Sequence, residues 1–117
     1  MKYATKEDQA RTLHFFRDRP LAQALFEQVS KYVDSVGTTE LVSTKSRVAW
    51  VRNTRFLWIH EATKDGIWLA FLLEKELSSP RVRTGATGRR FSHHLKVTGL
   101  DLEITSWIKL AYTHDAG

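Results

Sequence analysis

Lys64-Asp65-Gly66-Ile67-Trp68-Leu69-Ala70-Phe71-Leu72-Leu73 is the stretch that decides the fold, because it joins a turn signal to seven consecutive apolar residues. Asp-Gly between apolar segments is a strong hairpin signal, since glycine accepts the positive φ that a tight turn requires. A strand that is apolar on both faces is typical of the middle of a sheet. The stretch therefore predicts a hairpin whose second strand is central and covered on both sides.

Outward from this hairpin, the hydrophobic period is two and the residues are β-branched or aromatic, which is typical of strands. The predicted strands are residues 40–43, 47–52, 55–61, 67–73 and 93–98. Residues that disfavour regular structure, including Ser78-Ser79-Pro80 and Gly85-Ala86-Thr87-Gly88, separate the last two. We expect an irregular connection of roughly 15 to 19 residues there, a length more often functional than structural.

Helices are predicted at both ends of the chain. The strongest pattern runs from Pro20 to Val36, with Asp18 as the expected cap and Gly37 as the stop. A short helical turn capped by Thr12 is expected before it, preceded by frayed polar residues. Asp101 is expected to cap a final helix with a buried stripe of Ile104, Trp107, Ile108 and Ala111, and residues 113–117 to form a loose tail.

These elements predict an α+β fold, a mostly antiparallel sheet of about five strands with N-terminal and C-terminal helices packed against it. The 117 residues suit one domain, with a core at residues 12–112. The absence of cysteine excludes disulfides and thiolate chemistry. Residues 1–8 lack the apolar run of a signal peptide and the longest apolar run is seven residues, so we expect neither a signal peptide nor a membrane-spanning segment. We therefore expect a cytoplasmic protein without a membrane partner.

Positive charge is concentrated in two windows of the sequence. Residues 41–60 and 78–100 hold nine of the eighteen lysines and arginines and none of the thirteen acidic residues. Converging guanidinium groups bind phosphate or carboxylate groups through charge-assisted hydrogen bonds, and neighbouring glycines let backbone N–H groups approach the same anion. The expected anion-binding residues are Arg81, Arg83, Arg89, Arg90, His94, Lys45 and Arg47. A solvated loop is the alternative reading.

Other motifs indicate no catalytic, metal or cofactor site. The spacing from Gly85 to Arg90 does not match a phosphate-binding loop of nucleotide hydrolases. Lys45 follows Ser43-Thr44, which places an amine near a hydroxyl. Such a pair can act as base and nucleophile only if the amine is desolvated, and an exposed turn is the commoner structure for these residues. His93 and His94 are adjacent on a strand and point to opposite faces, so they cannot share one metal. We expect His94 on the polar face and His93 in the core.

Several separate motifs resemble one family. They are Pro20-Leu21 and Leu25-Phe26, Thr44-Lys45, Phe56, Trp68 to Leu73, the arginine-rich loop, His94, and Asp101 leading to Trp107-Ile108-Lys109-Leu110-Ala111-Tyr112. Together, over Thr12 to Tyr112, they resemble the uncharacterised domain of unknown function 5655. The resemblance implies a small prokaryotic α+β domain with no established activity. A more distant likeness to possible iron chaperones is discounted, because iron needs an acidic ridge and these windows are basic.

The sequence thus predicts a non-enzymatic domain that binds an anionic small molecule or a polyanion through the arginine-rich loop. One alternative is nucleic-acid binding across a basic sheet face, because aromatic residues alternate with cations in Trp50-Val51-Arg52 and Arg55-Phe56-Leu57-Trp58. A protein-interaction module is the second alternative.

Overall fold

The computed structural model describes residues 1–115, which form three helices and six strands. The elements in chain order are α1 (Lys6–Phe15), α2 (Pro20–Val36), β1 (Glu40–Ser43), β2 (Val48–Val51), β3 (Arg55–Ala62), β4 (Ile67–Leu73), β5 (Arg83–Thr87), β6 (Arg90–Val97) and α3 (Leu102–His114). The α+β class and the terminal helices are confirmed.

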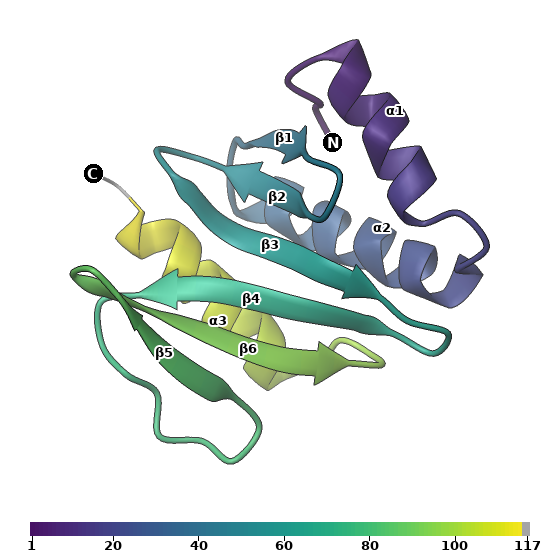
Figure 1. The fold of residues 1–117 in the computed structure, drawn as a ribbon. Helices are drawn as coiled ribbons and strands as arrows, with labels where there is room; N and C mark the ends of the chain where they lie inside the picture. The colour runs from purple at the N-terminus through teal and green to yellow at the C-terminus, as the bar shows by residue number, and fades with distance from the viewer. Residues whose placement is uncertain (116–117) are drawn as a thin grey trace.

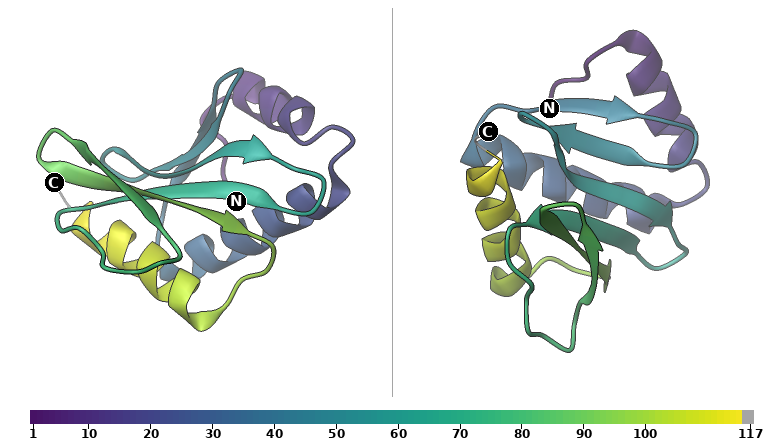
Figure 2. Two further views of the ribbon diagram at one scale, coloured as in Figure 1. Left: turned by 60° about the horizontal axis from the view of Figure 1, so that its bottom comes forward. Right: turned by 60° about the vertical axis from the view of Figure 1, so that its left-hand side comes forward.

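All six strands form one antiparallel sheet in the order β1-β2-β3-β4-β6-β5. Figure 1 looks onto one face of the sheet and shows α2 and α3 behind it. Figure 2 shows the same two helices together on that side, while α1 lies beside the β1 edge. The face turned to the viewer in Figure 1 has no helix across it, and we call it the open face.

The central position of β4 is confirmed, but its expected burial on both sides is wrong. Leu69 and Phe71 are fully buried against the helices, whereas Trp68 and Leu72 are half-buried on the open face. An apolar side chain on a sheet face is no proof of burial, because folded proteins keep much apolar surface in contact with water. The open face therefore displays apolar side chains that the sequence pattern assigned to a second core.

The hairpin between β3 and β4 is confirmed, but the reason for its glycine differs from the expected one. The N–H of Thr63 donates to the carbonyl of Gly66 at 2.9 Å and closes the turn. Gly66 does not adopt a positive φ. Instead, a Cβ at this position would lie 2.2 Å from the backbone oxygen of Val97, so glycine permits the close approach of β4 and β6.

The predicted irregular connection before the last strand contains β5, so the sheet has six strands rather than five. β5 and β6 form a tight hairpin whose turn holds Gly88 at a φ of 62°. Arg83-Thr84-Gly85-Ala86-Thr87 has little apolar character, and its residues are mostly exposed. Backbone pairing with β6 makes it a strand, and that pairing leaves no hydrophobic pattern in the sequence.

The starts of α1 and α2 differ from the predicted ones, and the start of α3 agrees. Helix α1 starts at Lys6 with Thr5 as its cap, not at Thr12. Asp18, the expected cap of α2, has a positive φ of 59°, and Arg19 takes the cap position without a side-chain bond. α3 is capped by Asp101 as predicted, with the expected stripe buried.

The expected loose tail at residues 113–117 is wrong for its first part. α3 continues to His114, and Asp115 is 3% exposed. The Asp115 carboxylate accepts hydrogen bonds from the N–H groups of Asn53 and Thr54, both at 2.9 Å, and so ties α3 to the β2–β3 turn. Residues 116 and 117 lie outside the described residues. None of the helices described here has the length and apolar character needed to cross a membrane.

Candidate functional site

A row of residues with contrasting sizes crosses the open face. The strand register places Ala49 of β2 opposite Trp58 of β3, Trp58 opposite Ala70 of β4, Ala70 opposite His94 of β6, and His94 opposite Arg83 of β5. Because alanine leaves space above the sheet, the large side chains on either side of Ala70 approach each other. The ring centroids of Trp58 and His94 are 5.9 Å apart although β4 lies between their strands.

A hollow of about 350 Å³ opens on this face beside the row. The first basic window supplies Arg47, Ala49, Arg55 and Trp58 to its lining, and the second supplies Thr87, Ser92 and His94, with Leu72 between them. Among the residues that the structure describes, this lining includes no carboxylate. The two basic windows, far apart in the sequence, therefore meet on one surface, and we call it the open-face hollow.

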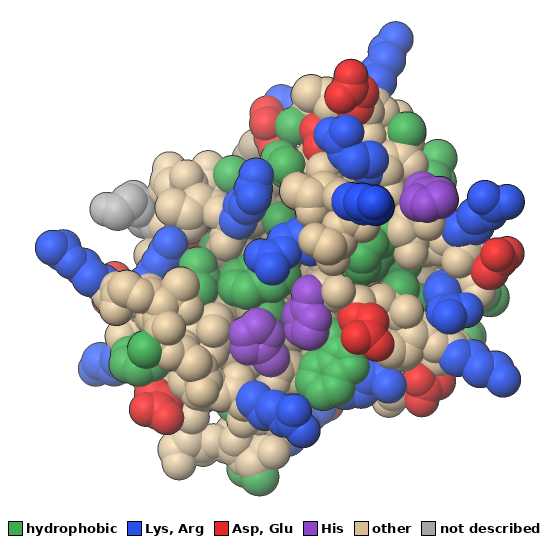
Figure 3. Space-filling model, viewed as in Figure 1, with side chains coloured by type: hydrophobic (Ala, Val, Ile, Leu, Met, Phe, Trp, Pro, Cys, Tyr) green, Lys and Arg blue, Asp and Glu red, His purple; other side chains and the backbone are tan. Residues whose placement is uncertain are grey.

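Two histidines lie together near the middle of the open face, as Figure 3 shows. Nδ1 of His94 and Nε2 of His60 are 3.3 Å apart, so one ring nitrogen donates a hydrogen bond to the other. Burial lowers the pKa of His94 below its ordinary value of 6.5, with smaller contributions from His60, His93 and Arg47. Burial likewise lowers the pKa of His60, against an opposing effect of Glu61. Both rings are therefore neutral at pH 7.

The cations of the open face are placed over aromatic rings. The Arg47 guanidinium lies 5.7 Å from the centroid of Trp58, and that of Arg83 lies 5.9 Å from the centroid of Trp68. Within residues 1–115, neither these arginines nor Arg55 form a salt bridge. Their charges are therefore not neutralised by any described carboxylate, and they remain able to pair with an external anion.

Two of the arginines expected at the anion site are engaged by carboxylates elsewhere. Arg81 donates to Asp101 at 2.9 Å and to Glu103 at 2.6 Å, at the start of α3. Arg90 lies 3.2 Å from Asp115. These partners are distant in the sequence or fall in the predicted tail, so the charge pattern gave no sign of them. The arginine-rich segment is thus divided between internal ion pairs and the open face.

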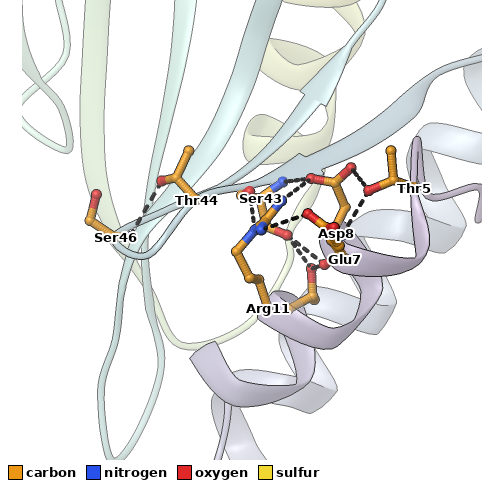
Figure 4. Close-up of polar contacts among 8 residues, drawn as sticks. Thr5, Glu7, Asp8, Arg11, Ser43, Thr44 and Ser46 are labelled. Carbon is orange, nitrogen blue, oxygen red and sulfur yellow. Dashed lines mark hydrogen bonds and ion pairs between the residues drawn. The ribbon is translucent and has the colours of Figure 1, made fainter.

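The remaining predicted residues lie at turns. Lys45 is exposed in the β1–β2 turn, and Arg89 is exposed in the β5–β6 turn. Figure 4 shows that Ser43, near Lys45 in the sequence, faces α1 instead of the open face. Its hydroxyl donates to the backbone carbonyl of Asp8. Of the seven predicted residues, Arg47 and His94 line the open-face hollow. Arg83 lies next to it on β5, directly opposite His94 of β6 in the strand register.

His93 lies on the helix side of the sheet, as expected from its position next to His94. It is fully buried and stacks on Phe71 with ring centroids 5.3 Å apart. Its Nε2 accepts a hydrogen bond from the N–H of Leu77 at 2.9 Å, so the proton is on Nδ1. Burial lowers its pKa below 6.5. This histidine fixes the segment that follows β4 and takes no part in the open face.

Sequence reasoning missed His60 and Trp68 as residues of this face. His60 follows Trp58 by two positions on β3, and Trp68 precedes Ala70 by two on β4, so period-two alternation places each pair on one face. The ring centroids of His60 and Trp68 are 6.0 Å apart. That alternation was the available signal, but the apolar character of β4 concealed which of its faces was open. No group of three metal-ligating side chains occurs in the described part of the chain.

The comparisons with known proteins identify a family and no function. The family model described as "Domain of unknown function (DUF5655)" matches residues 14–114, which is most of the chain. No curated protein and no solved structure matches this chain. The match contains all of β1 to β6 together with the whole of α2 and α3. The chain therefore belongs to the DUF5655 family.

Proposed function

We propose that this protein is a non-enzymatic binding domain whose anionic ligand occupies the open-face hollow. The observation that carries the proposal is the meeting of Arg47 and Arg55 with Ser92 and His94 around one hollow that no described carboxylate lines. Guanidinium groups, a hydroxyl and an imidazole are donors suited to phosphate, sulfate or carboxylate oxygens. Partial burial reduces screening and so strengthens these interactions relative to those of fully exposed charges.

A second hollow of similar size is less suited to an anion. It has a volume of about 360 Å³ and lies between α3 and the segment after β4. Glu74 and Glu76 are part of its lining, with Lys75 and His114. Two carboxylates repel an anion, whereas the open-face hollow offers two arginines. The charge of the lining therefore favours the open face.

Sulfate should stabilise the protein through the open-face hollow. A ligand that binds only the native state raises stability by RT ln(1 + [L]/Kd), so at ten times Kd the melting temperature should rise by about 6 °C relative to chloride at equal ionic strength. The Arg47→Ala/Arg55→Ala variant should bind sulfate about thirtyfold more weakly, because it removes two charged hydrogen bonds that each contribute on the order of 1 kcal/mol at a partly exposed site. Differential scanning fluorimetry and titration calorimetry measure both effects.

The matched control is Arg17→Ala/Arg19→Ala, which removes the same charge from the connection between α1 and α2. This control should bind sulfate like the unmodified protein. Equal losses in the two double variants would indicate attraction to net charge rather than to the hollow. The proposal is wrong if sulfate, phosphate and carboxylate anions all leave the melting temperature unchanged.

Sulfate affinity should increase as the pH falls below 6.5. His60 and His94 are neutral at pH 7 because their pKa values are lowered, chiefly by burial. Their protonation at lower pH adds positive charge beside the hollow, and sulfate keeps its own charge over this range. Calorimetry should give similar Kd values at pH 7.5 and 6.5 and a smaller Kd at pH 5.5. In the His60→Gln/His94→Gln variant, the sulfate Kd should no longer depend on pH in this way. If the variant keeps the pH dependence of the unmodified protein, the two histidines do not belong to the site.

A further inference from the structure

Four rings adjoin one another on the open face, and we call them the aromatic surface; Trp58, His94 and His60 meet edge to face, and the rings of His60 and Trp68 are tilted by 31°. Centroid distances are 5.9 Å from Trp58 to His94, 5.3 Å from His94 to His60, and 6.0 Å from His60 to Trp68. These rings come from β3, β4 and β6, and all four are half-buried. A binding site for a simple inorganic anion needs donors and has no use for a ring surface of this extent.

The other two tryptophans explain why this surface is distinctive. Trp50 is 1% exposed and Trp107 is 8% exposed, so both belong to the core between the sheet and the helices. Tryptophan in this protein therefore divides into two core residues and two residues on the open face. Half-exposed tryptophan is favourable where a flat apolar partner completes its burial.

Cations accompany both open-face tryptophans. Arg47 lies over Trp58, and Arg83 lies over Trp68. Arg55 is at the hollow, near Trp58. Lys96 is also on this face, but it pairs with Asp65 at 3.1 Å, and we leave it out of the binding set. The three unpaired arginines thus lie at opposite ends of the aromatic surface, two towards β2 and β3 and one on the β5 edge.

A ring surface with cations at its ends is complementary to a chain of bases linked by phosphates. Bases stack on aromatic side chains without regard to sequence, at about 1–3 kcal/mol per base, and arginines hold the backbone. A base that stacks on Trp58 takes the place now occupied by the Arg47 guanidinium, which is then free to reach a phosphate. A free small anion would use the arginines and leave the rings uncovered.

We propose that the ligand of the open face is single-stranded nucleic acid, whose bases stack on Trp58 and Trp68 and whose phosphates pair with Arg47, Arg55 and Arg83. This inference rests on the proposed function, because it assigns a ligand class to the same anion site. Ala49 lies opposite Trp58 on β2 and lines the hollow, so the space on that side of the Trp58 ring is open to a base. The site is shallow and spans several strands, as a flexible strand requires.

The test compares three fluorescein-labelled probes by anisotropy at low and moderate salt. The probes are a twelve-residue oligothymidylate, an abasic phosphodiester oligomer of equal charge, and thymidine monophosphate. The oligothymidylate should bind at least tenfold more tightly than either of the others, with an affinity that falls as salt rises. Unlabelled oligothymidylate should also quench tryptophan fluorescence, because its bases would stack on Trp58 and Trp68. Trp50 and Trp107 are buried and should contribute no quenching.

Trp58→Leu and Trp68→Leu should each weaken oligothymidylate binding about tenfold. Trp68 lies outside the lining of the hollow, so Trp68→Leu should also leave the thermal shift by sulfate intact. The retained sulfate response shows that the Trp68→Leu variant is folded and keeps its anion site. Tight binding of the abasic oligomer, or equal binding of the mononucleotide, would overturn the assignment to single-stranded nucleic acid while the anion site stands. Failure of sulfate as well as all three probes would overturn both proposals together.

Discussion

Phe71→Ala should lower the free energy of unfolding by about 3–5 kcal/mol, the largest effect that we expect from one substitution in the sheet. Phe71 is fully buried in the central strand and has Leu57 and His93 as its cross-strand neighbours. Its ring stacks on His93 at 5.3 Å and lies 6.0 Å from Trp107 of α3. The truncation leaves a void where the sheet meets the helix. Urea denaturation followed by circular dichroism measures the change.

Leu72→Ala is the matched control for Phe71→Ala. Leu72 is the next residue of β4, but it points to the open face and is half-buried. Because a half-exposed side chain loses less burial and leaves no enclosed void, the cost should be about 1 kcal/mol or less. A cost equal to that of Phe71→Ala would mean that the open face is covered in solution. The pair therefore tests the one-sided burial on which both proposals depend.

Asp8→Ala should lower the free energy of unfolding by about 2–3 kcal/mol, because it leaves buried donors without a partner. Asp8 is 4% exposed and joins α1 to β1, as Figure 4 shows. Its carboxylate accepts hydrogen bonds from the Ser43 N–H at 2.9 Å and from the Thr5 hydroxyl at 2.6 Å. Loss of this contact should release α1 from the sheet edge. Hydrogen exchange should then show faster exchange in α1 than in α2.

Glu7→Ala removes the same charge from the neighbouring position and serves as the control. Glu7 is exposed and pairs with Arg11 at 3.5 Å, so its loss should cost less than about 0.5 kcal/mol.

The contribution of Asp8 should also depend on pH. Burial raises the pKa of Asp8, but the hydrogen bonds from Thr5, Ser43 and Arg11 lower it by a larger amount, so the pKa lies below 3.8. The contribution of Asp8 is thus complete above pH 3.8 and is lost as the pH falls through the native pKa. The difference in the free energy of unfolding between Asp8→Ala and the unmodified protein should therefore become smaller in that pH range. A difference that stays constant would show that the Asp8 carboxylate is not held by these hydrogen bonds.

Elements with a strong local signal were predictable from the sequence. Helix α2 has apolar residues at helical spacing between Pro20 and Gly37, and the hairpin at Asp65-Gly66 joins two apolar strands. The cap of α3 at Asp101 was predicted from residue type alone. Each of these signals depends only on residues that are close in the sequence, so it can be interpreted without knowledge of distant contacts.

Elements that depend on distant partners were not predictable. The edge strand β5 is exposed and polar, and its only structural requirement is backbone pairing with β6. Helix α1 is polar along most of its length, and a buried carboxylate bonded to β1 holds it in place. Asp115 seemed to be part of a tail, yet its partners lie more than sixty positions earlier in the chain. Such contacts leave no periodic pattern.

The sequence by itself determined the fold class, the central place of β4, the opposite orientations of His93 and His94, and the two windows without acidic residues. These follow from local propensity, strand periodicity and simple charge counting. Only the tertiary structure decided that Arg81 and Arg90 are held by carboxylates, and that Arg47 and His94 line the same hollow. The reason is physical: strand order and register set which side chains meet, and these depend on pairings between residues far apart in the chain.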